Sequence, residues 1–168
     1  LGENSSQFES KLDMANIGLL GHSTGGGAGV AVAINDDRIK AIFGMDSWVE
    51  PIYDTELNKG LDIPTVFIRS GSWETGLNNT NLLRIVEDNI GNTRLYQIDG
   101  TTHYDFSMAY MYSPLTKPLG MTGELEGEYL VEILKSMMTD FFDQTLKVNN
   151  EVGLIVIEDR WVELRKLR

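Results

Sequence analysis

Gly21-His22-Ser23-Thr24-Gly25 is the stretch of sequence that decides the fold. It follows the apolar run Ile17-Gly18-Leu19-Leu20, which predicts a short buried strand, and it precedes the small residues 26–33, which predict a helix. The two outer glycines allow a turn that a Cβ atom would obstruct. A serine at the centre of G-x-S-x-G on a strand-to-helix turn exposes its Oγ, so we expect Ser23 to be a nucleophile.

The same glycines could instead form a phosphate-binding turn. A P-loop requires a lysine after its glycines, and a dinucleotide site requires G-x-G-x-x-G in frame; the sequence has neither. The nearest acidic residues, Asp36 and Asp37, fall at the far end of the predicted helix and not at the tip of the next strand. The motif therefore favours a nucleophile over a phosphate site.

A serine nucleophile needs a base, and the chain contains two histidines. His22 is adjacent to Ser23, and we expect its ring to point away from the serine. His103 lies in a polar loop directly after the strand-like run 93–98. We therefore predict that His103 is the base.

The acid of a triad should lie between serine and histidine in the chain, in the order known for this motif. Asp46 directly follows the strand-like run 40–45, and Glu74 lies in the loop after the strand-like run 63–69. The carboxyl ends of parallel strands are where such sheets assemble their sites. By this test both carboxylates qualify.

Three segments resemble the platelet-activating-factor acetylhydrolase family and, more broadly, esterases and lipases of the dienelactone-hydrolase and polyester-hydrolase type. They are the motif at 21–25, Gly44-Met45-Asp46-Ser47-Trp48-Val49-Glu50-Pro51, and the segment 102–106. In the acetylhydrolases the acid follows the strand after the nucleophile strand, within Asp-x-Trp-x-x-Pro, which implies Asp46. In most other α/β-hydrolases it lies one strand later, which would favour Glu74.

The resemblance implies a serine hydrolase that cleaves carboxylic esters through an acyl-enzyme. Ser23 would attack the ester, His103 would act as base and then acid, and Asp46 would orient the imidazole. The backbone N–H of Thr24 would be the first oxyanion donor. Thr24 departs from the bulkier residue that acetylhydrolases tend to carry there, so the phospholipid substrate is less firmly implied than the ester chemistry. No metal or organic cofactor is required.

Other side chains are candidates for lining the substrate pocket, namely His22, Trp48 and Trp73. Two alternatives remain open at this point. A thioesterase or peptidase would use the same triad, and a non-catalytic module of the same fold would bind a small ligand or a partner.

Strand-like and helix-like segments alternate, which predicts a mostly parallel sheet with flanking helices. We expect an α/β-hydrolase fold of which residues 1–168 form one domain, the carboxyl-terminal half from the nucleophile strand onward. The preceding half would come from the same polypeptide and supply the second oxyanion donor. Residues 1–14 are expected to form a helical lead-in, 128–147 an amphipathic helix, and 148–168 an edge strand, at 152–157, followed by a tail.

The composition indicates a soluble protein. The chain has 168 residues, 42% of them hydrophobic, no cysteine and a formal net charge of −11. The negative charge disfavours nucleic acid, whose phosphates favour a basic face. No apolar run approaches the length of a transmembrane segment. We expect a small-molecule ester or lipid substrate and a soluble protein that is either cytoplasmic or secreted.

Overall fold

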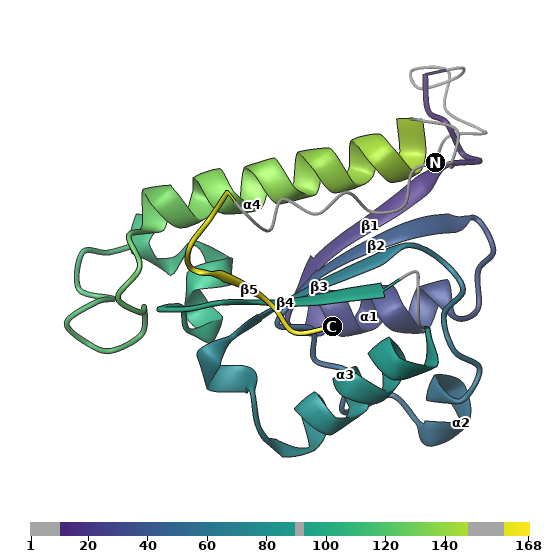
Figure 1. Cartoon of the computed structure of the whole chain (residues 1–168), viewed down its shortest axis with the longest axis horizontal. Helices are drawn as coiled ribbons and strands as arrows, with labels where there is room; N and C mark the ends of the chain where they lie inside the picture. Colours follow the sequence, from purple (N-terminus) through teal and green to yellow (C-terminus); the bar gives the residue numbers. More distant parts are fainter. Residues whose placement is uncertain (1–10, 90–92, 148–159) are drawn as a thin grey trace.

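One five-stranded sheet forms the centre of the computed structural model, which describes residues 11–89, 93–147 and 160–168. The strands lie side by side in chain order (Figure 1): β1 (Ile17–His22), β2 (Ile39–Met45), β3 (Thr65–Ser70), β4 (Thr93–Ile98) and β5 (Leu164–Lys166). The first four strands are parallel, and β5 runs antiparallel to β4. The predicted parallel sheet is therefore confirmed.

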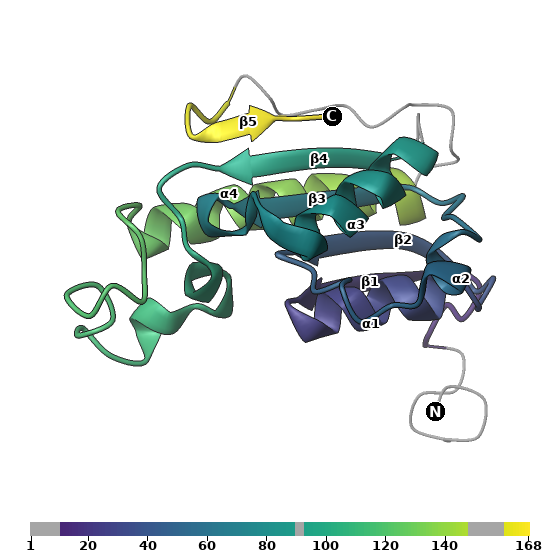
Figure 2. The ribbon, with the colours of Figure 1, turned by 90° about the horizontal axis from the view of Figure 1, so that it is seen from below.

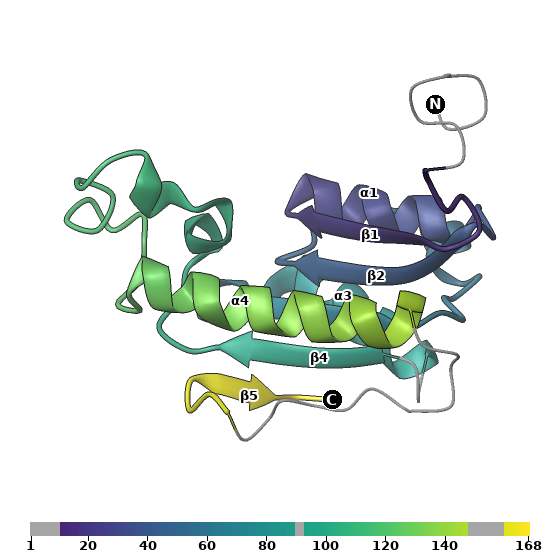
Figure 3. The ribbon, with the colours of Figure 1, turned by 90° about the horizontal axis from the view of Figure 1, so that it is seen from above.

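Helices cover both faces of this sheet. They are α1 (Thr24–Ala33), α2 (Asp54–Leu57), α3 (Gly76–Asp88) and α4 (Gly127–Phe142). Figure 2 shows α1 and α3 on one face, and Figure 3 shows α4 crossing the opposite face. Short 3₁₀ helices follow β3 and β4: η1 (Gly71–Trp73), η2 (His103–Ser107) and η3 (Ala109–Met111).

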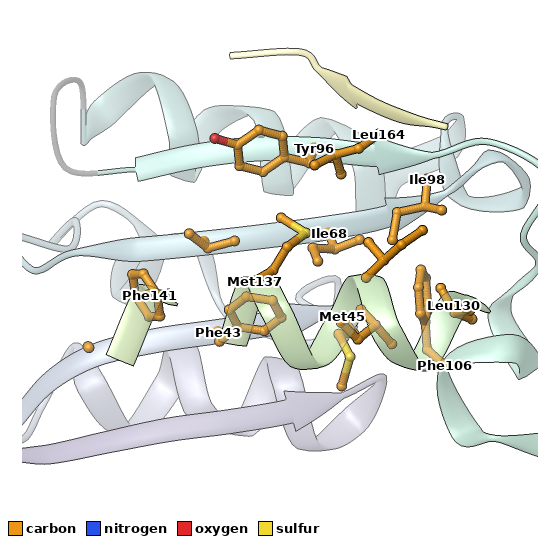
Figure 4. Packing of buried hydrophobic residues seen from close by; sticks show 14 residues of the cluster. Phe43, Met45, Ile68, Tyr96, Ile98, Phe106, Leu130, Met137, Phe141 and Leu164 are labelled. Carbon is orange, nitrogen blue, oxygen red and sulfur yellow. The ribbon is translucent and has the colours of Figure 1, made fainter. Parts of the chain in front are cut away.

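The alternation of side chains along the strands produces two apolar layers. Phe43 and Ile68 point to the α4 side, where they join Met137 and Phe141 in one buried cluster (Figure 4). Their chain neighbours Ile42 and Phe67 belong to the second cluster, with Val30 of α1 and Ile85 of α3. Because both faces are covered, the central strands read as continuous apolar runs in the sequence.

The arrowheads of the parallel strands point toward one end of the sheet, where the segment containing η2 and η3 also lies (Figure 3). The loops after β1, β2, β3 and β4 therefore meet at this end, as expected for a site in an open α/β sheet. At the side of the sheet, β1 is the edge strand, and no described strand pairs with its outer edge. Leu20 on β1 is 53% exposed.

Three expected segments differ from the structure or lie at least partly outside the described residues. The helix expected over 128–147 is α-helical only to Phe142 and continues as a π-helix, η4 (Asp143–Lys147). Within this wider turn the Thr145 hydroxyl donates to the Phe141 carbonyl at 2.8 Å, a side-chain bond that competes with the regular helix. The expected strand at 152–157 and residues 1–10 of the expected lead-in helix lie outside the described residues. The remaining lead-in residues, 11–14, are not helical. Among those described, no helix is both long and apolar enough to span a bilayer.

Candidate active site

Ser23 occupies a strained turn between β1 and α1. Its φ of 56° and ψ of −121° lie in a region that non-glycine residues rarely adopt. The turn closes because Gly21 has no side chain: a Cβ there would lie 2.6 Å from the Gly26 nitrogen. The Ser23 N–H donates to the Met45 carbonyl at 3.0 Å, which ties the turn to the end of β2. The predicted strand–turn–helix geometry around the serine is therefore present.

Asp46 follows directly after β2 and is 1% exposed. Its backbone has a φ of 40°, and its N–H donates to the Ile68 carbonyl at 2.8 Å. Ser70 holds the carboxylate twice, with its N–H 2.7 Å from Oδ1 and its hydroxyl 2.6 Å from Oδ2. Burial raises the pKa of this carboxyl above its ordinary value, and the hydrogen bonds from Ser70 and His103 act in the opposite direction.

The loop that carries Asp46 is packed directly on the first turns of α1. The Trp48 N–H donates to the Ser23 carbonyl at 2.8 Å. A Cβ on Gly27 would lie 2.7 Å from the Trp48 carbonyl carbon, and one on Gly26 would lie 2.9 Å from the Ser47 Cβ. The absence of side chains on these two glycines therefore sets the separation between the serine turn and the acid loop.

His103 begins η2 in the loop after β4. Thr102 and Asp105 form a capping box around it, and the Asp105 Oδ2 accepts from the Thr102 N–H at 2.6 Å and from the Thr102 hydroxyl at 3.0 Å. The same oxygen accepts from the Gly123 N–H at 2.8 Å, so it also holds the segment that precedes α4. Asp105 is buried. This loop conformation is thus fixed by hydrogen bonds on both sides of the histidine.

The imidazole of His103 connects the serine to the aspartate. Its Nε2 lies 3.0 Å from the Ser23 Oγ, and its Nδ1 lies 3.1 Å from the Asp46 Oδ2. Glu74, the other acid that the sequence left open, is 53% exposed and lies 4.0 Å from Arg69, with which it forms an ion pair. The fold therefore brings together Ser23, His103 and Asp46 from three different loops.

Aromatic rings surround the His103 imidazole. The Trp73 ring stacks on it with a centroid distance of 4.2 Å and an angle of 5° between the planes. The His22 ring lies 4.5 Å away with a tilt of 41°, and Tyr104 contacts it edge-on at 5.8 Å. Within the described structure the His22 Nε2 is buried and has no hydrogen-bond partner. Burial, and then the charge of His103, lowers the pKa of His22 below its ordinary value.

Two hollows lie beside these residues. The larger hollow has a volume of about 480 Å³ and extends along α1 from Thr24 to the segment that leads into α2. Its lining is mostly apolar and consists of Thr24, Gly27, Ala28, Ala31, Trp48, Pro51, Ile52, Tyr53 and Glu56. A smaller one of about 210 Å³ lies between Trp48 and Trp73. Of the three predicted pocket residues, Trp48 and Trp73 line these hollows, whereas His22 packs against His103. The Thr24 N–H belongs to the first turn of α1, where backbone donors have no partner inside the helix.

Two polar residues of the site were not identified from the sequence. Ser70 is the last residue of β3, and the only signal for it was a small polar residue at the carboxyl end of a buried strand. Asp105 carries a recognisable signal, since Thr102-x-x-Asp105 has the spacing of a capping box. The described residues contain no group of three or more His, Cys, Asp or Glu side chains arranged to hold a metal ion.

Comparison with known proteins identifies the family of the chain and a solved structure with the same fold. The family model for "Platelet-activating factor acetylhydrolase, isoform II" matches residues 3–159. The platelet-activating factor acetylhydrolases of Gallus gallus and Cavia porcellus are 21% and 20% identical to this chain, and each alignment covers 94% of it. These alignments cover 36% and 35% of the relatives, so the chain spans about a third of their length.

A solved structure shares the fold. The ferulic acid esterase from Streptomyces cinnamoneus superposes with a TM-score of 0.73 at 19% sequence identity. The superposition covers 94% of this chain and 48% of that esterase. The mostly parallel sheet with helices on both faces is thus part of an α/β-hydrolase fold.

Proposed function

Because the chain belongs to the family of platelet-activating factor acetylhydrolase, isoform II, we propose that it hydrolyses carboxylic esters with Ser23, His103 and Asp46 as its catalytic triad. One observation carries the proposal: both ring nitrogens of His103 are engaged, Nε2 with the serine at 3.0 Å and Nδ1 with the aspartate at 3.1 Å. A nucleophile, a base and a group that orients the base are the minimum set for this chemistry.

The first half of the reaction forms an acyl-enzyme. The Ser23 Oγ attacks the ester carbonyl carbon while its proton passes to the His103 Nε2. The tetrahedral intermediate then collapses, the bond to the alcohol oxygen breaks, and the same Nε2 returns the proton to the departing alkoxide. Asp46 accepts from Nδ1 throughout, which fixes the tautomer and stabilises the imidazolium.

Water completes the cycle by attacking the acyl carbon while the His103 Nε2 takes its proton. The bond from the acyl carbon to the Ser23 Oγ then breaks, Nε2 returns the proton to Ser23, and the carboxylic acid leaves. The Thr24 N–H at the start of α1 is the first donor to the oxyanion in both halves. We propose that the second donor comes from the part of the fold that precedes the nucleophile strand, carried by the same polypeptide. Loss of one such donor costs about 10²–10³ in rate in a known protease.

Asp46 rather than Glu74 is the acid in this proposal. Asp46 is buried, is hydrogen-bonded by Ser70, and lies within hydrogen-bond distance of His103. Glu74 is more than half exposed and pairs with Arg69. A buried carboxylate with fixed partners is the type of group that can hold an imidazole in one orientation.

The hollow along α1 supports a substrate with an apolar part. Its lining includes Thr24, whose N–H is the proposed first oxyanion donor, together with Ala28, Trp48 and Tyr53. Pockets for small ligands are typically apolar with a few polar groups that fix orientation. We therefore propose that the hydrocarbon portion of the ester binds there.

Ester hydrolysis by matched variants tests the triad. In the full chain, Ser23→Ala should abolish turnover of p-nitrophenyl acetate, and Asp46→Asn should lower kcat by a factor on the order of 10⁴, as in a serine protease triad. Glu74→Gln is the matched control and should stay within about threefold, since the Glu74 side chain is 53% exposed and its pair with Arg69 is long, at 4.0 Å. Unchanged turnover in Ser23→Ala would refute the nucleophile. A loss confined to Glu74→Gln would move the acid to that residue.

A further inference from the structure

The stack of Trp73 on His103 is a feature that the triad chemistry leaves unexplained. Trp73 ends η1, which follows β3, whereas His103 begins η2, which follows β4. Their planes are nearly parallel, 5° apart, with centroids separated by 4.2 Å. This is the closest of the ring contacts made by His103 in the described structure.

Hydrogen bonds alone do not fix the tilt of the imidazole. The contacts to Ser23 and Asp46 hold the two ring nitrogens, but hydrogen bonds tolerate misalignments of tens of degrees. A flat ring stacked at 4.2 Å blocks rotation of the imidazole face. The Trp73 indole therefore supplies a constraint that neither hydrogen bond supplies.

The stack also matters for charge. During acylation the His103 ring becomes an imidazolium, and its side chain is only 20% exposed. A cation over an indole face is attracted by the ring quadrupole, and tryptophan is the best of the aromatic side chains for this. The charge thus develops where water is scarce and an indole is already in contact.

Three titratable groups face the same ring in the described residues. Asp46 accepts from Nδ1, Tyr104 approaches edge-on, and His22 lies 4.5 Å away. Burial lowers the pKa of His22 below its ordinary value, and its Nε2 is buried without a hydrogen-bond partner in the described structure. Both observations disfavour a second positive charge beside the imidazolium, so His22 favours the attraction by Trp73.

We propose that Trp73 is a positioning residue for His103: its indole face holds the imidazole between Ser23 and Asp46 and stabilises the imidazolium formed during acylation. This inference rests on the proposed function. A positioning role predicts that Trp73 affects the reactivity of Ser23. A residue that only lined the pocket would affect substrate binding and leave the reactivity of Ser23 unchanged.

Two substitutions separate stacking from space filling. Trp73→Phe keeps an aromatic face, whereas Trp73→Leu keeps an apolar side chain without one. Trp161→Phe is the matched control, since Trp161 contacts Tyr129 and lies outside the site. Thermal melting of each variant shows whether the fold is retained.

Reactivity is measured as the rate constant for labelling of Ser23 by a fluorophosphonate and as kcat and KM for p-nitrophenyl acetate. Trp73→Leu should lower the labelling rate and kcat by about tenfold with little change in KM, within the range expected for loss of a cation–π contact. Trp73→Phe should stay within about threefold of the unaltered protein, and Trp161→Phe should equal it.

Nuclear magnetic resonance supplies a readout that does not depend on activity. The chain has two histidines, so its histidine ring spectrum is simple. The ring current of Trp73 should shield the His103 ring protons, and Trp73→Leu should shift them downfield while Trp73→Phe retains part of the shielding.

The outcomes separate the two claims. Absence of Ser23 labelling in the unaltered protein would refute the proposed function, and the role of Trp73 with it. Normal labelling of the unaltered protein, with Trp73→Leu as reactive as Trp73→Phe, would overturn the role of Trp73 alone. Unchanged His103 shifts in Trp73→Leu would also overturn it, because the stack itself would be absent.

Discussion

Gly27→Ala tests the close packing of α1 on the loop that carries the proposed acid. An added Cβ would lie 2.7 Å from the Trp48 carbonyl carbon and nearer still to its oxygen. Gly29, in the same helix, is the matched control, because a Cβ there would meet only Leu19, at 3.8 Å. Both substitutions gain the same helix propensity, so their difference isolates the steric conflict.

The expected magnitude follows from that distance. Carbon atoms in contact are about 3.5 Å or more apart, so the helix and the loop must separate by roughly 0.8 Å from the 2.7 Å given by the structure. Overpacking of this kind costs about 1–3 kcal/mol. Gly29→Ala should instead stabilise the protein by about 0.5–1 kcal/mol. Because Gly27→Ala gains the same helix propensity, we expect it to be less stable than Gly29→Ala by about 1–3 kcal/mol, the cost of the overpacking alone.

Urea unfolding followed by circular dichroism measures this difference, and thermal melting should show about 2–4 °C for each kcal/mol in a chain of this size. Activity provides a second readout, since a displaced Trp48 also displaces Asp46. A misplacement of about 1 Å can cost about 10² in rate. Equal stability of Gly27→Ala and Gly29→Ala would refute the close approach of helix and loop.

Three further predictions concern the polar groups around the site. Ser70→Ala removes the hydroxyl that donates to Asp46 but leaves the backbone N–H, so kcat should fall about tenfold, as for loss of one hydrogen bond to a charged group; an unchanged kcat would contradict this. Burial holds the pKa of His22 below its ordinary value of 6.5, so His22 binds a proton more tightly in the unfolded chain than in the folded one. The free energy of unfolding should therefore decrease as the pH falls below about 6.5. His22→Phe should reduce this loss, measured as urea midpoints at pH 7.5 and 5.5, and an equal loss in both proteins would count against it. Asp105→Asn weakens three hydrogen bonds to one buried carboxylate and should lower the free energy of unfolding in urea by about 1–3 kcal/mol. Asp54→Asn, at an exposed carboxylate, should lower it by less than about 1 kcal/mol, and equal losses would refute the role of Asp105 in holding its loop.

Local sequence patterns predicted most of the sheet, because its strands are short apolar runs that end at glycines or polar loops. The strand expected at 40–45 is β2 (Ile39–Met45), and the one expected at 93–98 is β4 (Thr93–Ile98). Both strands are buried between helices on the two faces of the sheet, so apolar residues mark each of them in the sequence. The short β5 (Leu164–Lys166) was not predicted at these residues, because a three-residue strand depends on the open edge of β4 rather than on its own sequence.

The candidate site was predictable only where a motif specifies geometry. Ser23 was recognisable because G-x-S-x-G implies a strand-to-helix turn, and His103 because the chain has few histidines. The strand pattern left Asp46 and Glu74 open because both follow strands, whereas the resemblance to the acetylhydrolases favoured Asp46. Contacts between loops distinguish them: Ser70 donates to Asp46 from the end of the neighbouring strand, and no local pattern specifies that pairing. The ring stack on His103 depends in the same way on two loops meeting in space.

The most direct test of the proposed triad is to label the full chain with a fluorophosphonate and to locate the adduct by peptide mass spectrometry. We expect one adduct, on Ser23, because its Oγ lies 3.0 Å from the His103 Nε2 that would take its proton. Labelling should disappear in His103→Ala, which leaves the serine in place but removes the base. Failure of the unaltered protein to react, or an adduct on Ser23 that persists in His103→Ala, would contradict the claim that these residues form an activated serine hydrolase site.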